Sequence, residues 1–520
     1  MKKPIVYIIG AGPGDPWLIS VRGLRCLNLA DVIIYDHLVH ERLLRHTRPE
    51  VEKIDVGPAA PEPLEQEAIC YLLADKAQEG KVVARLKWGD PFVFDRGGEE
   101  ALFLHEHGVR FEVVPGIPAA IGVPAYAGIP ITYPGGGDTV TFVRGHENEH
   151  SKKPHVDWAS LGKLGGTVVC YSGPKQLPGI LSAMLAHGWS DGDAAALVFN
   201  GTMPEQETIQ ATLGELAELA RQPKYRNPAM LIVGRVTALR EHLRWFDDRP
   251  LFGKRVVVTR PKEQAAELVD ALEQLGASVV EAPTIRIVPP DDFAPLDEAC
   301  ATVGEYDWVV FTSANGVDYF FQRMNTGIGD ARSLAGVRIC AIGPGTAERL
   351  AKHCLRVDLV PPEYRAEAVV EAMRATGSLE GKKFLLPRAD IARELLAVEL
   401  RRSGAIVNEV TAYRTVSVEP DRESEPDIYR MLLDRKVDVL TFTSASTVRN
   451  FVKLYGVEPV ADLLAPVAIA SIGPVTAEAA QQCGIRTSIM PSEYTIPGLV
   501  RAIVEHFEKA GNRQPAASQP

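Results

Sequence analysis

The sequence predicts a soluble α/β protein of several domains, and two observations support this fold class. Short apolar runs rich in β-branched residues alternate with longer helical patterns along nearly the whole chain, as in parallel sheets buried between layers of helices. A chain of 520 residues is long enough for roughly three or four domains of about 100–200 residues. A polar stretch near residue 250 separates a first half, about 1–246, from a second half, with a linker at 247–252.

The composition indicates which kinds of binding partner do not suit this chain. The chain is 46% hydrophobic and 24% charged, with a formal net charge of −11, which argues against nucleic acid or a membrane surface as the main partner. No apolar run reaches the ~18–20 residues that a membrane span needs. The seven cysteines lack metal-ligand spacing and indicate reduced thiols. With no signal peptide evident, we expect a cytoplasmic protein, ending in a disordered tail at 509–520.

The first half begins with a strand at 5–9 that enters the glycine turn GAGPGDP (10–16). A dinucleotide fingerprint needs a third glycine where this chain has Asp15. Pro13 also removes a backbone donor from the turn, so a nicotinamide or flavin site is disfavoured. Further strands are expected at seven apolar runs: DVIIYD (31–36), VVARL (82–86), FEVVPG (111–116), TVTFVRG (139–145), TVVCYSG (167–173), AALVFNG (195–201) and AMLIVGR (229–235).

The second half contains an internal repeat of about 130 residues. GKRVVVTRP (253–261) returns as GKKFLLPRA (381–389), LGASVVEAP (275–283) returns as SGAIVNEVT (403–411), and three further pairs of blocks follow in the same order. They are FTSANGV (311–317) with FTSASTV (442–448), AIGPGTAERL (341–350) with SIGPVTAEAA (471–480), and PPEYRAEAVVEAM (361–373) with PSEYTIPGLVRAI (491–503). Each copy has the size of one doubly wound, parallel-sheet domain. Two such lobes should face each other across a cleft.

The FTSA and IGP segments are expected at strand ends, where ligands bind in open α/β sheets. Each leads into a helix, so each offers unpaired backbone N–H groups to an anion. The plain alternative is that the serines and glycines only cap helices or form tight turns. Because four such loops should meet at one cleft, we favour an anion site.

The first half resembles the tetrapyrrole methyltransferases over about residues 4–246, and most of all uroporphyrinogen-III C-methyltransferase. Besides the proline loop GAGPGDP, five blocks match in order: VRGLRCLNLADVIIYDHLV (21–39), RLKWGDPFVFDRGGEE (85–100), VVPGIPAAIGVPAYAGIPIT (113–132), NGT (200–202) and PAMLIVGRV (228–236). The resemblance implies two α/β lobes with S-adenosyl-L-methionine between them, usually as a homodimer. It also implies transfer of two methyl groups to ring carbons of uroporphyrinogen III, giving precorrin-2.

The same resemblance implies roles for single residues. Asp36 would be the base that removes a proton from the methylated substrate, although an aspartate after a strand is also a common cap or turn residue. The cofactor positions would be Pro13, Gly89, Asp90, Val93, Pro118, Ala119, Ser172, Gly201 and Ala229. Candidates for the carboxylates of the substrate are Arg22, Arg85, Lys87 and Arg96, each of which could instead be solvated surface charge.

Several positions depart from the methyltransferase pattern. Trp88 and Asp95 stand where the family has glycines, and Ser172 stands where it has methionine. Pro58 and Ala59 replace a Lys-Arg pair, Pro118 replaces a small hydroxyl residue, and YPGGG (133–137) replaces a His-Arg pair. An indole at a glycine position adds volume that a packed site does not absorb cheaply. The alternative is therefore an active second half joined to a degenerate, non-catalytic methyltransferase domain.

The second half resembles uroporphyrinogen-III synthase over about residues 253–508, through TRP (259–261), AYRT (412–415), YTIPGLV (494–500) and the repeated blocks. In that family the chain crosses twice between lobes, which implies one lobe of about 253–288 plus 418–508 and another of about 289–417. The implied reaction cyclises hydroxymethylbilane with inversion of ring D. Its product is the substrate of the methyltransferase, so a bifunctional enzyme of sirohaem and cobalamin precursor synthesis is expected. A third hypothesis is that the two lobes form a solute-binding receptor. The fused first half argues against this function.

The synthase resemblance implies that Tyr413 assists the loss of water, although a strand tyrosine can simply be core. Arg260 and Arg388 occupy equivalent places in the two copies and could clamp carboxylates. The loop residues expected to bind the substrate are Ser313, Asn315, Gly343, Ser444, Ser446, Gly473 and Thr476. HENEH (146–150) looks like a metal-binding run, but its charged surroundings indicate a solvated loop, and no metal is expected.

Overall fold

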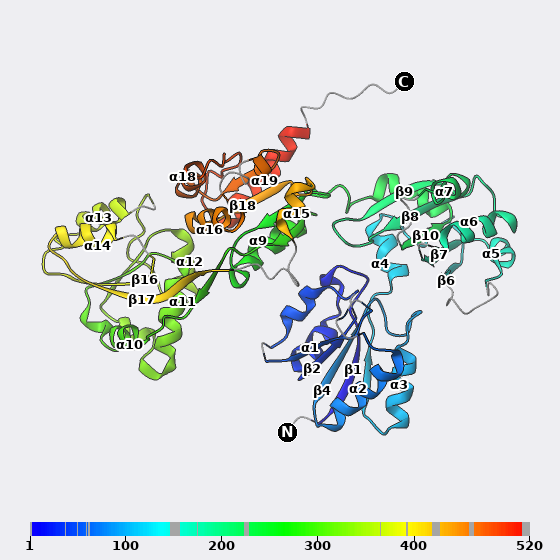
Figure 1. Ribbon diagram of the computed structural model, residues 1–520, viewed down its shortest axis with the longest axis horizontal. Coiled ribbons are helices and arrows are strands. Elements are labelled where there is room, and N and C mark those ends of the chain that lie inside the picture. The colour runs from blue at the N-terminus through cyan, green and yellow to red at the C-terminus, as the bar shows by residue number, and fades with distance from the viewer. Residues whose placement is uncertain are drawn as a thin grey trace. The chain divides into compact units, whose positions relative to one another are not determined.

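The computed structural model describes most of the chain, and its coverage is as follows. The described residues are 3–36, 38–48, 50–58, 60, 63–145, 156–173, 175–222, 228–363, 366–391, 394–418, 427–456 and 462–511. The chain forms two units, Met1–Gly253 and Lys254–Pro520, each of which is described by itself below (Figure 1). HENEH (146–150) lies outside the described residues.

The first lobe of unit 1 is a five-stranded parallel sheet in the order β3-β2-β4-β1-β5. Its strands are β1 (Ile5–Gly10), β2 (Val32–Tyr35), β3 (Glu52–Asp55), β4 (Val82–Lys87) and β5 (Phe111–Val114). Its helices are η1 (Pro16–Leu18), α1 (Val21–Leu29), η2 (Glu41–His46), α2 (Gln66–Gln78) and α3 (Gly97–Glu106). Every residue of β4 is buried, because this central strand has a neighbour on each side and is covered on both faces.

The second lobe of unit 1 is a five-stranded mixed sheet in the order β6-β7-β10-β8-β9. Only β6 and β7 run parallel, and the other pairs are antiparallel. Its strands are β6 (Val140–Arg144), β7 (Thr167–Ser172), β8 (Ala194–Phe199), β9 (Glu207–Thr212) and β10 (Ala229–Val233). Its helices are α4 (Ala119–Tyr126), α5 (Trp158–Leu164), α6 (Leu177–Ala186), α7 (Leu213–Leu219), η4 (Arg235–Leu239) and α8 (Arg240–Leu243).

Three glycines bring the backbone of the first lobe together where β1, β4 and β5 end. A Cβ atom on Gly116 would lie 2.2 Å from the carbonyl oxygen of Gly89 and 2.7 Å from the Cα atom of Gly10. No other residue type fits such a backbone contact. The contact fixes the path of the loop after β4, which carries several of the expected site residues.

The first lobe of unit 2 is a four-stranded parallel sheet in the order β12-β11-β18-β19. Its strands are β11 (Arg255–Val258), β12 (Ser278–Glu281), β18 (Val439–Phe442) and β19 (Ala468–Ser471). Its helices are α9 (Lys262–Gln274), α15 (Ile428–Leu433), α16 (Ala445–Tyr455), α18 (Pro474–Gln482) and α19 (Ile496–Gly511). Because α19 continues to Gly511, the disordered tail expected from residue 509 is wrong for its first three residues; residues 512–520 lie outside the described part.

The second lobe of unit 2 is a five-stranded sheet in the order β13-β17-β16-β14-β15. Its strands are β13 (Ile285–Val288), β14 (Trp308–Phe311), β15 (Arg338–Ala341), β16 (Lys383–Ala389) and β17 (Ile406–Ser417). Its helices are α10 (Ala294–Ala301), η5 (Val303–Glu305), α11 (Ala314–Arg323), η6 (Met324–Ile328), η7 (Ala331–Leu334), α12 (Pro344–Lys352), α13 (Ala366–Ala375) and α14 (Leu395–Arg402).

The structure corrects the expected crossing between these lobes. Residues 285–288 were expected in the lobe that begins at residue 253, but β13 pairs with β17 in the other lobe. The pairing is antiparallel, so the sheet is mixed rather than wholly parallel. The physical reason is the length of β17, whose 12 residues run past the end of β16 and leave Arg414–Ser417 free to pair with β13.

The internal repeat produces the same local geometry in both lobes of unit 2. Ser313 and Ser444 are N-caps of α11 and α16 with the same φ of −160°. Gly343 and Gly473 are N-caps of α12 and α18, each followed by proline at the first helical position, where proline costs no hydrogen bond.

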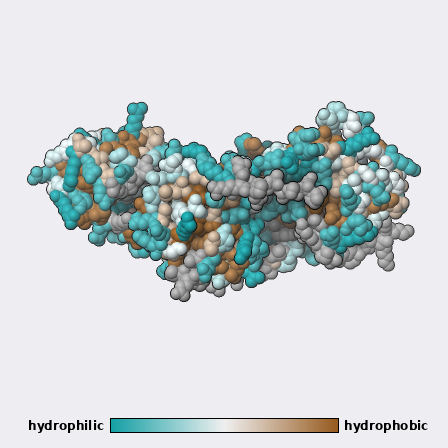
Figure 2. All heavy atoms as spheres, turned by 90° about the horizontal axis from the view of Figure 1, so that it is seen from above, coloured by the Kyte–Doolittle hydropathy of each residue, from teal (hydrophilic) through white to brown (hydrophobic). Residues whose placement is uncertain are grey.

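None of the helices in the described ranges is long and apolar enough to cross a bilayer. On the face seen in Figure 2, hydrophobic residues form small separate groups among hydrophilic ones. Scattered exposure of this kind is ordinary for a protein surface.

We predict that Gly116→Ala destabilises unit 1 by about 3 kcal/mol, because backbone atoms of Gly10 and Gly89 would have to move apart to admit the methyl group. Gly98→Ala is the control. Gly98 lies in α3, and no atom lies within 4 Å of the place that its methyl group would take, so the change should stabilise the protein by up to about 1 kcal/mol. Urea unfolding of the two variants measures both effects, and equal midpoints would contradict the packing argument.

Candidate active sites

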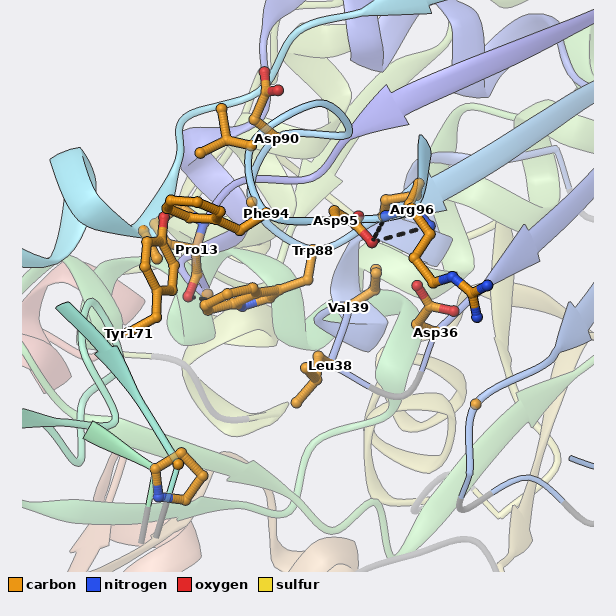
Figure 3. Close-up of a pocket in the computed structure, with 18 of the residues that line it drawn as sticks. Pro13, Asp36, Leu38, Val39, Trp88, Asp90, Phe94, Asp95, Arg96 and Tyr171 are labelled. Atoms are coloured by element: carbon orange, nitrogen blue, oxygen red, sulfur yellow. Dashed lines mark hydrogen bonds and ion pairs between the residues drawn. The ribbon is translucent and has the colours of Figure 1, made fainter. Parts of the chain in front are cut away.

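Unit 1 contains a cavity of about 1230 Å³ that is lined by residues of both of its lobes. Pro13, Asp36 and Trp88 enter it from the loops after β1, β2 and β4. Tyr171 and Met230 enter it from β7 and β10 of the second lobe (Figure 3). The cavity therefore lies beyond the carboxyl ends of parallel strands, where α/β folds place their ligands.

The cavity brings together most of the positions that the sequence assigns to a cofactor. Eight of the nine line it: Pro13, Gly89, Asp90, Val93, Ala119, Ser172, Gly201 and Ala229. Pro118 is not among the lining residues and is the N-cap of α4, directly before Ala119. Gly89 has a φ of +67°, which glycine adopts without strain.

A buried cluster of charges forms the floor of the cavity. Arg85 and Lys87 alternate on β4, and their side chains are only 1% and 2% exposed. Both contact Oε1 of the fully buried Glu100 on α3, Arg85 through Nε at 3.1 Å and Lys87 through Nζ at 3.0 Å. Arg85 also donates to Asp36 at 2.8 Å, and Lys87 lies 3.3 Å from Asp95.

The cluster contains three carboxylates and two cations. The pKa values of Glu100 and Asp95 are shifted in opposite directions. Burial raises the pKa of Glu100, but the charges of Arg85 and Lys87 outweigh burial and the net pKa is lowered. Burial also raises the pKa of Asp95, and the charge of Lys87 offsets only part of that rise. The pKa of Asp95 is therefore raised, whereas that of Glu100 is lowered, and Asp95 lines the cavity.

Asp36, the expected base, is well placed to exchange a proton with a ligand. Its side chain is 26% exposed and lines the cavity. The guanidinium of the buried Arg85 holds its Oδ1 atom, which fixes the orientation of the carboxylate. Its Oδ2 atom forms no hydrogen bond or ion pair with the residues that the structure describes.

The other basic candidates divide into two groups. Arg96 lines the cavity and forms an exposed pair with Glu99 at 2.6 Å. Arg22 does not line it, and its exposed side chain is paired with Glu112. The structure therefore brings Arg96, but not Arg22, to the site.

In unit 2, the strand-end serines act locally as helix caps. Ser313 accepts a hydrogen bond from the N–H of Gly316 at 3.0 Å, and Ser444 accepts one from the N–H of Thr447 at 3.3 Å. The Ser446 hydroxyl lies 2.9 Å from that of Ser444. Capping uses the side chains and leaves the first N–H groups of α11 and α16 for a ligand. Thr476 is buried in α18.

Tyr413 lies on β17 with its hydroxyl at these loops. Its oxygen is 3.0 Å from that of Ser313, and it also hydrogen-bonds Asn315. The ring stacks on Tyr319 at 5.9 Å. Burial raises the pKa of Tyr413, so the hydroxyl keeps its proton at neutral pH and can donate it. Tyr413 is thus both a core aromatic and a hydroxyl group at the strand ends.

Arg260 and Arg388, the expected pair of carboxylate clamps, belong to different lobes of unit 2. Arg388 is buried on β16 and lies 2.5 Å from Glu409. Arg260 follows β11, close to α9, where Gln264 hydrogen-bonds Asn315 of the other lobe. Sequence reasoning missed Gln264, which no motif marked.

Comparisons with known proteins match both halves of the chain. Residues 5–217 match the family model of tetrapyrrole (corrin/porphyrin) methylases, and residues 266–501 match that of uroporphyrinogen-III synthase HemD. A porphyrin biosynthesis protein HemD from Ruminiclostridium josui is 36% identical over 97% of this chain and 98% of its own. The chain belongs to this family of methylase–synthase fusions. Both resemblances expected from the sequence are confirmed.

Other relatives of the fusion match one or both domains. A uroporphyrinogen-III C-methyltransferase from Bacillus subtilis is 33% identical over 73% of this chain and 78% of its own. The solved uroporphyrin-III C-methyltransferase of Thermus thermophilus with S-adenosyl homocysteine is 36% identical, at a TM-score of 0.39 over 45% of this chain and 99% of its own. A mutant uroporphyrinogen III synthase of the same organism is 18% identical, at a TM-score of 0.39 over 50% of this chain and all of its own.

Besides Asp95, three side chains that depart from the expected methyltransferase pattern line the cavity. The Trp88 indole donates from Nε1 to the carbonyl of Pro13 at 3.0 Å, and Figure 3 shows its ring beside Pro13. The Ser172 hydroxyl donates to the carbonyl of Ala229 at 2.7 Å. Pro58 lines the cavity and is exposed, whereas Ala59 lies outside the described residues. The Ser172 hydroxyl proton is thus already engaged, and the side chain of Pro58 carries no polar group.

We predict that Glu100→Ala destabilises the fusion by about 3–5 kcal/mol, because it leaves two cations buried without their shared counter-ion. The matched control is Glu99→Ala, which removes only an exposed pair with Arg96 and should change stability by less than about 1 kcal/mol. Chemical unfolding at pH 7 distinguishes the two variants.

The same cluster predicts a pH dependence. Because the folded pKa of Glu100 is lowered, its carboxylate stabilises the fold above its ordinary pKa of 4.5, and this contribution is lost as the pH falls through the lower folded value. Unfolding midpoints measured from pH 7 down to 3 should therefore fall less steeply for Glu100→Ala than for Glu99→Ala. Parallel curves for the two variants would refute the role of Glu100.

Proposed function

We propose that the chain catalyses two consecutive reactions: unit 2 converts hydroxymethylbilane to uroporphyrinogen III, and unit 1 methylates that product to precorrin-2 with S-adenosyl-L-methionine. The observation that carries this proposal is the presence of both domains in one chain, since the product of one is the substrate of the other. We further propose that the protein acts in the cytoplasm, as a homodimer formed through unit 1. The product would enter the sirohaem or cobalamin branch.

In unit 2, the residues would mainly bind and orient the substrate. The linear tetrapyrrole carries eight carboxylates and supplies its own reactive carbons. Tyr413 would donate its proton to the leaving hydroxyl group, which departs as water. Ring D then attacks the resulting electrophilic carbon through its substituted carbon and forms a spiro intermediate. One bond of this intermediate breaks and the ring closes again in the inverted orientation, and the proton lost when the macrocycle closes would return to the tyrosinate. The first N–H groups of α11, α12, α16 and α18 would bind carboxylates.

In unit 1, the cavity suits a cationic cofactor beside a large substrate. Its volume of about 1230 Å³ exceeds the usual range of about 300–1,000 Å³ for one small ligand. The excess of carboxylates in the floor cluster favours a positively charged sulfonium. When bound, S-adenosyl-L-methionine supplies an electrophilic methyl group. Pro13, Gly89, Ala119 and Gly201 would hold it, and Asp36, oriented by Arg85, would accept the proton that the methylated ring releases.

A second candidate function is favoured by Trp88. Its indole lines the cavity and is held by Pro13, one of the residues expected to hold the cofactor. If the ring occupies space that the adenosine requires, unit 1 binds a tetrapyrrole without methylating it. Only unit 2 would then be catalytic.

We predict that the full-length protein, given hydroxymethylbilane and S-adenosyl-L-methionine, forms precorrin-2, and forms uroporphyrinogen III when the methyl donor is left out. Mass spectrometry of the tetrapyrroles identifies the products. Asp36→Asn should lower methyl transfer by about 100-fold or more and leave ring closure unchanged. Tyr413→Phe should slow ring closure and leave methylation of added uroporphyrinogen III unchanged.

This crossed design separates the two halves of the proposal. Ring closure without protein is subtracted from every rate. Loss of both activities in either variant would indicate misfolding, which circular dichroism detects. Uroporphyrinogen III as the end product in the presence of the methyl donor would reject methyl transfer and favour the second candidate.

A titration with S-adenosyl-L-methionine tests the role of Trp88. We predict that the wild-type protein binds the cofactor, and that Trp88→Gly binds it at least as tightly because removal of the indole only enlarges the cavity. Trp17→Gly, which changes an exposed tryptophan outside the cavity, is the control. No heat with the wild type at millimolar cofactor, together with binding by Trp88→Gly, would establish the degenerate domain instead.

A further inference from the structure

Arg260 has an environment that is unusual for a half-buried arginine. It lies two residues after the end of β11 and makes no hydrogen bond or ion pair with any residue that the structure describes. Other enclosed arginines of unit 2 are paired: Arg388 with Glu409 at 2.5 Å and Arg323 with Asp297 at 2.6 Å. A guanidinium offers five donors, and removing it from water without a partner is costly. The position therefore suits a ligand that accepts hydrogen bonds.

A second arginine, Arg349 on α12 of the other lobe, adds positive charge to the surroundings of Arg260. Burial lowers the pKa of Arg260, Glu267 offsets part of that effect, and the positive charge of Arg349 on α12 lowers the pKa further. Arg349 is held by Asp318, whose carboxylate oxygens lie 2.6 Å from Nε and 2.7 Å from Nη2. Its Nη1 atom has no such contact within the described ranges. Asp318 on α11 thus fixes Arg349 one turn from Asn315, with donors to spare.

The two arginines lie where the strand-end loops of the lobes meet. Gln264, one turn into α9 from Arg260, hydrogen-bonds Asn315 at the start of α11. Asn315 in turn hydrogen-bonds Tyr413. A chain of contacts therefore connects the region of Arg260 to the hydroxyl that is expected to release water.

Comparison of the two repeat copies shows that the two arginines have no matching pair on the other side of unit 2. Arg349 belongs to AIGPGTAERL (341–350), and the equivalent position of SIGPVTAEAA (471–480) is Ala479. Arg388, the repeat equivalent of Arg260, is already bound by Glu409. The two lobes therefore share their backbone loops but differ in these charges.

We propose that Arg260 and Arg349 clamp one carboxylate of the linear, many-armed substrate between the lobes of unit 2. The proposal rests on the synthase reaction proposed above and names the residues that orient its substrate. Each ring of the substrate carries similar acidic arms, so backbone loops that repeat in both lobes discriminate poorly between its two ends. Because the clamp is present on one side of unit 2 and not on the other, it binds one end of the linear substrate in preference to the other end. It thereby positions that end relative to Tyr413. Both arginines are positioning residues.

Steady-state kinetics of ring closure by the full-length protein test the clamp. Arg260→Gln and Arg349→Gln should each raise KM for hydroxymethylbilane by about 10–100-fold, the range expected for loss of a hydrogen-bonded charge pair, with kcat changed by less than about threefold. The double variant should fall short of the product of the two single effects, because both side chains bind the same carboxylate. Arg332→Gln, an exposed arginine paired with Asp330 in the same lobe, should behave as the wild type.

Two further measurements distinguish a clamp from a structural role. Arg260→Gln should unfold at the same temperature as the wild type or a higher one, because it removes an unpaired cation near a like charge. Arg260→Lys keeps the charge but loses the planar fork, and should recover only part of the affinity. A wild-type KM for Arg260→Gln, or a lowered unfolding temperature that accounts for its loss of activity, would overturn the clamp.

Binding of uroporphyrin III separates failure of the clamp from failure of the synthase proposal. This stable octacarboxylate is titrated by fluorescence quenching against the wild type and Arg260→Gln. Weaker binding by the variant supports the clamp even if the wild type does not convert hydroxymethylbilane, an outcome that would reject only the reaction. Equal affinities would overturn the clamp even if the wild type is an active synthase.

Discussion

The shared carboxylate of Glu100 is the interaction on which the floor of the methylase cavity depends. Arg85 and Lys87 occupy alternate positions of a central strand, and every residue of that strand is buried. Neither cation could remain there without a counter-ion, since isolated buried charges are costly. Glu100 neutralises one equivalent of charge, and the remaining positive charge is directed to Asp36 and Asp95, both of which line the cavity. The core of the first lobe thus sets the positions of the two carboxyl groups that a ligand would meet.

In the synthase unit, the described loops at the strand ends contain helix-capping hydroxyl groups in place of a buried charge cluster. Its lobes hold no comparable cluster of charges in the described residues, and the repeated loops use hydroxyl side chains to cap helices. The hydroxyl group of Ser313 makes two contacts, because it caps α11 and also contacts the hydroxyl group of Tyr413. Capping keeps the helix ends ordered, so their free N–H groups keep fixed directions. A substrate with many carboxylates can be folded against such donors, so that only a few side chains, such as the proposed clamp of Arg260 and Arg349, are needed to orient it.

Much of this architecture could be predicted from the sequence, because it depends on local patterns. The repeat predicted two lobes with equivalent strand-end loops, and eight cofactor positions met in one cavity because motif residues follow strand ends. What could not be predicted depends on contacts between distant segments. The pairing of β13 with β17 follows from the length of β17, and the partner of Arg388 is Glu409 on the neighbouring strand. The ion pair of Arg22 with Glu112, which keeps Arg22 away from the cavity, is likewise a contact between distant segments of the chain.

The signal for Arg349 was present in the sequence but required the structure to interpret it. Arginine and Ala479 stand at equivalent positions of the repeat, and such a difference has no meaning until the facing lobe is known. The same reasoning explains how a chain with a net charge of −11 can receive a polyanion. Screening confines long-range repulsion to about 8–10 Å at ordinary ionic strength, so binding is decided by the groups that lie close to the ligand. At the strand ends of unit 2, Arg260 and the backbone N–H groups at helix N-termini supply positive potential that the overall charge conceals.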